Sequence, residues 1–260
     1  MTARDKCSGL DPRKRAYIIC TTSRSGSTLL CRMLAATGVA GAPDSHFHKP
    51  DIAAWELAHG IAPMAVSAQE RRARVFAAAL ETGRGGGEVF GLRLMRKSFA
   101  YLSQQIDVLH PGLGGHTAGF QAVFGAIVYV HLSREDKLAQ AISMVKADQS
   151  GLWHRHADGT ELERTGPPRA LVYDPQAIAR HLSALERDDD AWVKWFADEG
   201  IAPLRLKYED LTADPLGAVC GILAALDLDC RHADGVLPDT ARLADRTSRA
   251  WAERFLNDRA

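Results

Sequence analysis

The sequence has few cysteines, no net charge and no long apolar run, and each absence excludes a class of protein. Its five cysteines are odd in number and form no Cys-x-x-Cys pair, which disfavours a disulfide framework and a structural zinc site. The formal net charge is zero, so bulk charge does not indicate a nucleic-acid partner. No apolar run approaches the ~18 residues of a transmembrane segment. We therefore expect a reduced, soluble, cytoplasmic protein.

The length and composition fit a single folded domain. The chain has 260 residues, and 46% of them are hydrophobic, which is enough for a full core. Residues 1–15 are polar and lack the apolar core of a signal peptide. We expect a polar N-terminal tail over residues 1–15 and one domain over residues 16–260.

Residues 16–38 have the pattern of a strand, a turn and a helix. Residues 16–20 are a short apolar run typical of a buried strand, and residues 29–34 carry apolar side chains at helical spacing. The turn between them contains Ser23, Arg24, Ser25, Gly26, Ser27 and Thr28. This arrangement directs backbone N–H groups and a helix N-terminus at one point, where an anion binds favourably. An ordinary βα turn rich in hydroxyl side chains is the alternative interpretation.

This turn lacks the features of a nucleoside triphosphate loop. A Walker A sequence needs two glycines and a lysine, whereas this turn has only Gly26 and its cation is Arg24. A kinase also needs metal ligands, usually an Asp at the end of a neighbouring strand, and neither of the other strand candidates ends in Asp. The sequence favours an anion site without a metal; a P-loop kinase is the alternative.

A second strand, polar turn and helix follow later in the chain. Residues 126–132 are a β-rich apolar run, Arg134 lies in the turn, and a helix over residues 135–148 contains Ser143. Two such units predict an α/β fold with a parallel sheet and a ligand at the carboxyl ends of its strands. A further strand, residues 88–95, contains Arg93, which either pairs structurally or meets an anionic ligand.

The segments between these units are predicted to be mostly irregular. Residues 39–50, 110–119 and 209–215 are expected to be loops or turns, and residues 151–168 a surface loop or lid.

Three separated segments together resemble the sulfotransferases that use 3′-phosphoadenosine-5′-phosphosulfate (PAPS). Residues 22–30 resemble their 5′-phosphosulfate loop, residues 130–143 their 3′-phosphate unit, and residues 206–215 a Tyr-Glu-Asp-Leu segment. The chain looks most like the bacterial carbohydrate group, which includes the trehalose, nodulation-factor and lipopolysaccharide enzymes. The resemblance implies a P-loop-like three-layer fold, with a central parallel sheet and helices on both faces.

The resemblance also implies an activity and a role for each site residue. It implies in-line transfer of a sulfuryl group from PAPS to a hydroxyl of a sugar or glycolipid, without a metal. Arg24 would bridge the leaving oxygen and the sulfuryl group, Arg134 and Ser143 would hold the 3′-phosphate, and Arg93 would face the sulfuryl group or the acceptor. The 5′-phosphate would be held by Ser23, Ser25, Gly26, Ser27 and Thr28.

The general base is the main departure from the family pattern. In the trehalose enzyme a Glu looks like the base, and the alignment places Ser45 at that position. Asp44, His46 and His48 are nearby substitutes, and a histidine near neutral pKa suits the role. The missing Glu also keeps a non-catalytic nucleotide-binding protein as an alternative. A basic segment, residues 242–249, would replace the family's C-terminal PAPS loop, and the resemblance allows a homodimer.

Overall fold

The centre of the molecule is a parallel sheet of four strands. The computed structural model describes residues 15–62, 64–241 and 243–259. The strands are β1 (Arg15–Thr21), β2 (Val89–Met95), β3 (Ala126–Ser133) and β6 (Leu204–Lys207), in the spatial order β2-β1-β3-β6. All pair in parallel, so their carboxyl ends lie along one edge of the sheet.

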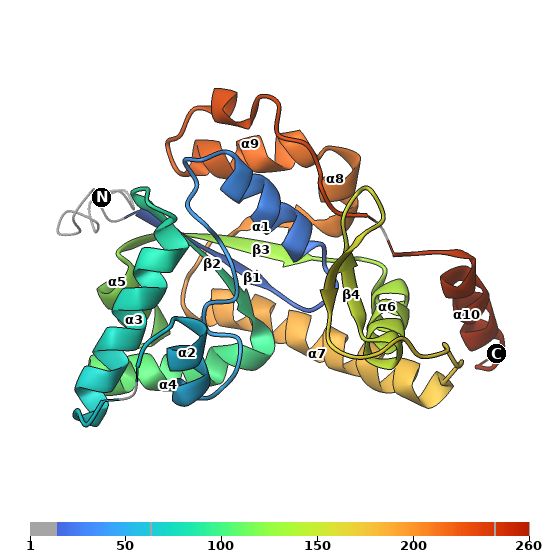
Figure 1. The fold of residues 1–260 in the computed structure, drawn as a ribbon, viewed down its shortest axis with the longest axis horizontal. Helices are drawn as coiled ribbons and strands as arrows, with labels where there is room; N and C mark the ends of the chain where they lie inside the picture. Colours follow the sequence, from blue (N-terminus) through green and yellow to red (C-terminus); the bar gives the residue numbers. More distant parts are fainter. Residues whose placement is uncertain (1–14, 63, 242, 260) are drawn as a thin grey trace.

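Helices cover both faces of this sheet (Figure 1). One face carries α1 (Ser27–Ala36), α9 (Pro215–Ala225) and the short 3₁₀ helix η2 (Cys230–Ala233), with α8 (Tyr208–Ala213) beside them. The other face carries α2 (Ile52–Ala58), α3 (Ala68–Arg84), α4 (Arg96–Leu109), α5 (His116–Phe124) and α7 (Pro175–Asp198). A third cluster joins α7 to α6 (Lys137–Ser150) and α10 (Arg246–Asn257). The predicted three-layer parallel fold is confirmed.

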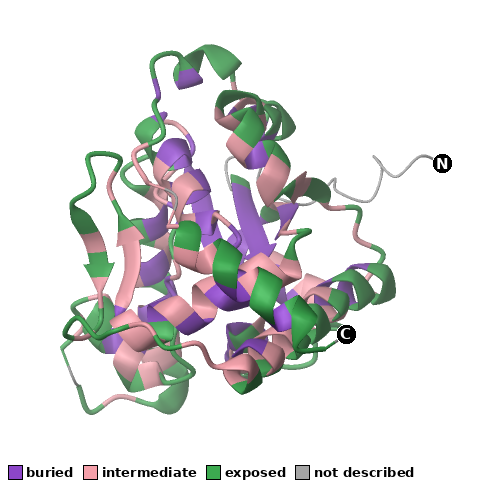
Figure 2. Ribbon diagram, turned by 90° about the vertical axis from the view of Figure 1, so that its right-hand side faces the viewer, coloured by how far each residue is buried: buried purple, intermediate pink, exposed green. Residues whose placement is uncertain are grey.

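The alternating side chains of β1 explain why two helical layers form. Tyr17 and Ile19 pack with α1 and α9, whereas Ala16, Ile18 and Cys20 pack with the layer of α3, α4 and α7. Because both faces are apolar, β1 is a continuous hydrophobic run rather than an alternating one. Figure 2 shows that buried segments, in purple, lie at the centre of the ribbon.

Three segments that the sequence predicted to be irregular are regular. The predicted loop over residues 110–119 ends in α5, which begins at His116, and the predicted turn over residues 209–215 contains most of α8. The predicted surface loop over residues 151–168 holds an antiparallel hairpin of β4 (Leu152–Arg155) and β5 (Glu161–Arg164). Tertiary packing organises these segments: Phe120 and Leu211 are fully buried.

The hairpin is bound to a segment near the C-terminus. His156 pairs with Thr240 in an antiparallel bridge, and the Ala241 N–H donates to the Arg155 carbonyl at 3.0 Å. Arg32 of α1 forms an ion pair with Asp239, in which Nε donates to Oδ2 at 2.6 Å. The hairpin is thus fixed over the start of α1 by contacts distant in sequence.

Two expectations about the cysteines and the tail need correction. Cys220 of α9 and Cys230 of η2 form a disulfide, although the number and spacing of cysteines predicted none. Cys20 and Cys31 are buried free thiols. Arg15, predicted as the last residue of the tail, is the first residue of β1, and residues 1–14 lie outside the described residues. Within the described residues, no helix is long and apolar enough to cross a membrane.

Candidate active site

The loop between β1 and α1 has a backbone that few residues could adopt. Arg24 has φ 63° and Gly26 has φ 83°, both in the left-handed region. A Cβ atom on Gly26 would lie 2.7 Å from Cδ2 of Tyr208, so both the backbone and the packing require glycine here. The Gly26 carbonyl accepts the first hydrogen bond of α1, from the Leu30 N–H. The turn therefore leads directly into the helix N-terminus.

Contacts with two other elements, β3 and α6, fix this loop. Thr21 Oγ1 lies 2.7 Å from the Leu132 carbonyl of β3, to which it donates, and 2.6 Å from Ser25 Oγ. Gln140 of α6 is fully buried and donates from Nε2 to Thr22 Oγ1 at 2.9 Å and to the Ser23 carbonyl at 2.6 Å. Ser25 is buried and does not line the cavity described below, so its side chain stabilises the loop from behind.

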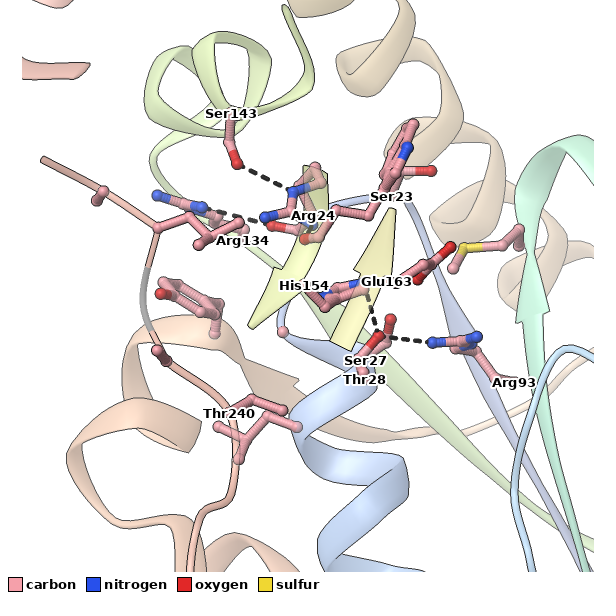
Figure 3. A pocket seen from close by; sticks show the side chains of 18 of the residues that line it. Ser23, Arg24, Ser27, Thr28, Arg93, Arg134, Ser143, His154, Glu163 and Thr240 are labelled. Carbon is pink, nitrogen blue, oxygen red and sulfur yellow. Dashed lines mark hydrogen bonds and ion pairs between the residues drawn. The ribbon is translucent and has the colours of Figure 1, made fainter. Parts of the chain in front are cut away.

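Arg24 and Arg134 converge at one end of the site (Figure 3). Arg24 Nε donates to Ser143 Oγ at 2.9 Å, and its Nη1 donates to the Trp153 carbonyl at 2.5 Å. Arg134 Nη1 lies 3.4 Å from the Arg24 carbonyl oxygen. Burial, and then the charge of Arg134, lower the pKa of Arg24 to about 10. Two cations held this close favour an anion between or beside them.

One guanidinium nitrogen of Arg134 makes no hydrogen bond to the described residues. Its guanidinium lies over the Tyr208 ring, with Cζ 4.4 Å from the ring centroid. Its Nε is buried without a hydrogen-bond partner in the part of the chain that the structure describes. The Arg134 side chain also lines the first cavity described below, where its charge favours an anion.

At the other end of the site, each of the three guanidinium nitrogens of Arg93 donates a hydrogen bond. Nε donates to Ser45 Oγ at 2.9 Å, Nη1 to Thr28 Oγ1 at 2.8 Å and Nη2 to Asp44 Oδ1 at 2.7 Å. The sequence left open whether this charge in a central strand pairs structurally or faces a ligand. It pairs with Asp44, and it also lines the cavities described below.

The hairpin brings two further titratable side chains to this end. His154 of β4 lies with Nε2 3.0 Å from Thr28 Oγ1 and 3.5 Å from Glu163 Oε2 of β5. Burial, and then the charges of Arg24 and Arg93, lower the pKa of His154 to about 3. The ring is therefore neutral near pH 7, and its contact with Glu163 is not an ion pair.

Two adjoining cavities occupy this edge of the sheet. The first, of about 300 Å³, is lined by the loop, by Arg134 and Ser143 and by the hairpin. Among the described residues, four cations line it, and they are Arg24, Arg93, Lys97 and Arg134. A single carboxylate, that of Glu163, lines it with them. The second, of about 580 Å³, lies against α1 and α3 and is more mixed in charge. The residues that line both are Thr28, Ser45, Arg93 and Glu163.

The structure brings most of the predicted site residues together. The first cavity is lined by Ser23, Arg24, Gly26, Ser27, Thr28, His48, Arg93, Arg134 and Ser143. Asp44 and His46 line the second cavity instead. Arg24 bonds to Ser143, although the sequence assigned these two side chains to opposite ends of the ligand. Arg242, from the basic segment expected to cover the site, lies outside the described residues.

Sequence reasoning missed the residues that the hairpin contributes. His154 and Glu163 reach the site because β4 and β5 pair. Asp158-Gly159 in the hairpin tip, with Gly159 at φ 87°, is a strong hairpin signal and could have predicted this element. Gln140 was also missed, although it precedes Ser143 by nearly one helical turn. Among the described residues, no group of three or more His, Cys, Asp or Glu side chains could hold a metal ion.

The fold and the cation-lined cavity define an α/β protein with an anion site at the carboxyl edge of a parallel sheet. The sequence model of the Stf0 sulphotransferase family matches residues 16–258. The chain belongs to that family and is a sulfotransferase, as its three sequence segments predicted.

Relatives of known activity match almost the whole chain. Trehalose 2-sulfotransferase of Mycobacterium tuberculosis (strain ATCC 35801 / TMC 107 / Erdman) is 30% identical, over 93% of this chain and 94% of that protein. Trehalose 2-sulfotransferase of Mycolicibacterium smegmatis (strain ATCC 700084 / mc(2)155) is 29% identical, over 94% of this chain and 95% of that protein. Among solved structures, the sulfotransferase domain from the Synechococcus PCC 7002 olefin synthase is 16% identical with a TM-score of 0.38, and the match covers 93% and 94% of the two chains.

Proposed function

We propose that this enzyme transfers a sulfuryl group from PAPS to a hydroxyl of a sugar or glycolipid. The observation that carries the donor assignment is the cationic lining of the first cavity. Arg24, Arg93 and Arg134 all line it, together with the loop and the start of α1. PAPS is a polyanion with phosphate at both the 5′ and the 3′ position, so it needs more than one such group.

In the proposed reaction the residues of the loop hold and polarise the donor. The acceptor oxygen forms a bond to sulfur while the bond from sulfur to the 5′-phosphate oxygen breaks, and adenosine 3′,5′-bisphosphate leaves. Arg24, with the N–H groups at Ser27 and Thr28, would stabilise the charge that develops on the leaving oxygen. Arg134, whose side chain lines the first cavity, would hold the 3′-phosphate through charge-assisted hydrogen bonds from its guanidinium.

The second cavity is proposed to hold the acceptor. It adjoins the donor cavity at Thr28, Ser45 and Arg93, so a hydroxyl placed there could approach the sulfur. Its lining includes the polar side chains Arg32, Asp44, His59 and Thr82, which suit the hydroxyl groups of a sugar. Both relatives are named for sulfation of trehalose, which makes trehalose the first acceptor to test.

Radiolabelled PAPS tests the activity directly. We expect the label to pass to trehalose or to a member of a panel of mono- and disaccharides. We also expect calorimetry to show binding of adenosine 3′,5′-bisphosphate. Absence of binding at millimolar concentration would contradict the proposal.

Replacing Arg134 tests how the donor is recognised. We expect Arg134→Ala to weaken adenosine 3′,5′-bisphosphate binding by about 10- to 100-fold, because charge-assisted hydrogen bonds are lost. Adenosine 5′-monophosphate, which lacks the 3′-phosphate, should lose much less affinity. Arg205→Ala is the matched control, because Arg205 is an exposed strand residue outside both cavities. Equal losses for the two nucleotides would rule out the assigned role of Arg134.

A cytoplasmic location and a homodimer stay predictions of the sequence and of the resemblance. Cell fractionation tests the first, and analytical ultracentrifugation of the purified chain tests the second.

A further inference from the structure

We propose that Glu163 is the general base that removes the proton from the acceptor hydroxyl. The inference rests on the proposed sulfuryl transfer and concerns the one role in it for which the sequence left several candidates open. Ser45, at the position where the resemblance implies a Glu, cannot accept this proton unaided. The structure supplies a carboxylate from the hairpin instead.

The position of Glu163 between the two cavities is the first argument. The base must reach the acceptor oxygen while that oxygen faces sulfur, so it must stand where the donor and acceptor cavities meet. The lining shared by the two cavities consists of Thr28, Ser45, Arg93 and Glu163. An arginine and two hydroxyl side chains do not act as general bases. Glu163 supplies the carboxylate of this set, which is the group that can.

The carboxylate of Glu163 is also uncommitted. Among the described residues it accepts no hydrogen bond, and its side chain is 54% exposed. Its nearest polar contact is His154 Nε2 at 3.5 Å. Thr28 Oγ1 accepts from Arg93 Nη1, and the Thr28 hydroxyl can in turn donate to His154 Nε2. In that tautomer Nε2 carries no proton, and His154 does not compete with an acceptor hydroxyl for the Glu163 oxygens.

The three bases predicted from the sequence are less suitably placed. Asp44 lines the acceptor cavity only, and its carboxylate is bonded to Arg93 and to the Ser45 N–H. His46 is buried beside the same cavity, with Nε2 3.2 Å from the Ala42 carbonyl. His48 lines the donor cavity only. None of the three reaches both sides of the junction.

The proposed step balances without a further reactant. The acceptor O–H bond breaks and its proton passes to Glu163 as the oxygen forms its bond to sulfur. The electron pair of the broken S–O bond goes to the 5′-phosphate oxygen, beside Arg24 and the loop. Glu163 then releases the proton to solvent through its exposed side.

The test compares Glu163→Gln with the unchanged protein in two measurements. We expect transfer from labelled PAPS to the best saccharide acceptor to fall by about 100- to 1,000-fold in kcat, the range of general base catalysis. We expect the affinity for adenosine 3′,5′-bisphosphate to stay within about two-fold. Glu161→Gln is the matched control, since Glu161 lies on the same strand, pairs with Arg164 and lines neither cavity.

A second variant separates a missing base from a damaged hairpin. Adding Ser45→Glu to Glu163→Gln returns a carboxylate to the same junction from another element, and we expect it to restore at least about ten-fold in kcat. Transfer by Glu163→Gln at the unchanged rate, weakened nucleotide binding, or no recovery in the double variant would overturn the inference. The proposed function fails separately, if the unchanged protein neither binds the nucleotide nor transfers the label.

Discussion

At the scale of single residues, Gly26 combines two demands that other residues cannot meet together. Its φ of 83° is in the left-handed region, and a Cβ atom there would press on the Tyr208 ring. The same ring lies beneath Arg134, so a displaced Tyr208 would also move that guanidinium. We expect Gly26→Ala to lower the free energy of unfolding by about 2–4 kcal/mol, from backbone strain and overpacking, and to weaken nucleotide binding.

Denaturant unfolding and calorimetry check this prediction. Gly221→Ala is the control, because Gly221 lies within α9 with nothing within 4 Å of its Cβ position. That variant should be neutral or more stable by up to about 1 kcal/mol. Equal stability of the two alanine variants would contradict the argument from φ and packing.

The sequence predicted that the loop residues lie together beside a strand end, but it gave no indication that Glu163 lies near them, for a physical reason. The loop around Arg24 is specified locally, since a buried strand, small residues and a helix follow one another in the chain. Glu163 is 118 or more residues from Ser45 and Thr28, and it reaches them through hairpin pairing and the contacts of the hairpin with residues 239–241. No short sequence pattern can predict that residues so far apart in the chain lie beside one another. The sequence shows that Arg93 is unusual as a charge in a central strand. Its partners, Asp44, Ser45 and Thr28, lie in other parts of the chain and are brought to it by the fold.

At the scale of elements, one carboxylate on α7 ties together β3 and α6. Asp189 accepts from Lys137 Nζ at 2.8 Å and lies 3.0 Å from His131 Nε2. Lys137 Nζ also donates to the Arg134 carbonyl at 2.6 Å, so the same contact fixes the turn that carries Arg134. Burial raises the pKa of Asp189, but the hydrogen bonds from His131 and Lys137 outweigh it, and the net pKa is lowered.

The lowered pKa gives a pH dependence with a defined sign. A depressed carboxyl pKa stabilises the fold above the unfolded value of about 3.9, and this contribution is lost as the pH falls through the folded pKa. We expect Asp189→Asn to be less stable than the unchanged protein at pH 7 by about 1–3 kcal/mol. The difference should narrow below about pH 4. Thermal unfolding at several pH values measures it.

A control from the same helix isolates the buried contact. Asp198 pairs with Lys194 on the exposed side of α7, and such pairs contribute little. Asp198→Asn should therefore change the stability by less than about 0.5 kcal/mol at every pH. A pH-independent deficit in Asp189→Asn would show that the lost contact is not electrostatic.

The sequence predicts helices and strands best where a segment shows one clear pattern of hydrophobic residues. The strand around residues 16–20 is apolar throughout, the strand around residues 126–132 is apolar except for His131, and α7 has a regular apolar stripe ending in Trp192, Trp195 and Phe196. Helix α8 was missed because its six residues carry little periodicity of their own. It forms because Leu211 packs into the core and Tyr208 packs against Gly26.

At the scale of the whole molecule, the disulfide closes the outer layer on the α1 side. Cys220 and Cys230 join α9 to η2 across a separation of 10 residues. Closing a loop of that size removes about 2–3 kcal/mol of unfolded-state entropy. We expect a reducing agent to lower the Tm by about 5–10 °C, and Cys220→Ser to make the Tm insensitive to it.

Thiol titration tests the pairing without relying on stability. Protein prepared without a reducing agent should expose three reactive thiols in denaturant rather than the five present in the sequence. Five reactive thiols would contradict the disulfide and restore the reduced chain that the sequence predicted.

The hairpin of β4 and β5 has a consequence for how the enzyme family can diverge. Arg93, Arg134 and the loop are attached to the carboxyl ends of the central strands, whereas Glu163 and His154 stand on a separate two-stranded element. Changes in that element can alter the proposed proton acceptor and the wall of the proposed acceptor cavity while the β1–α1 loop, Arg93 and Arg134 keep their places on the sheet. Selection for a new acceptor can therefore act on about a dozen residues, and it need not disturb the sheet on which folding depends.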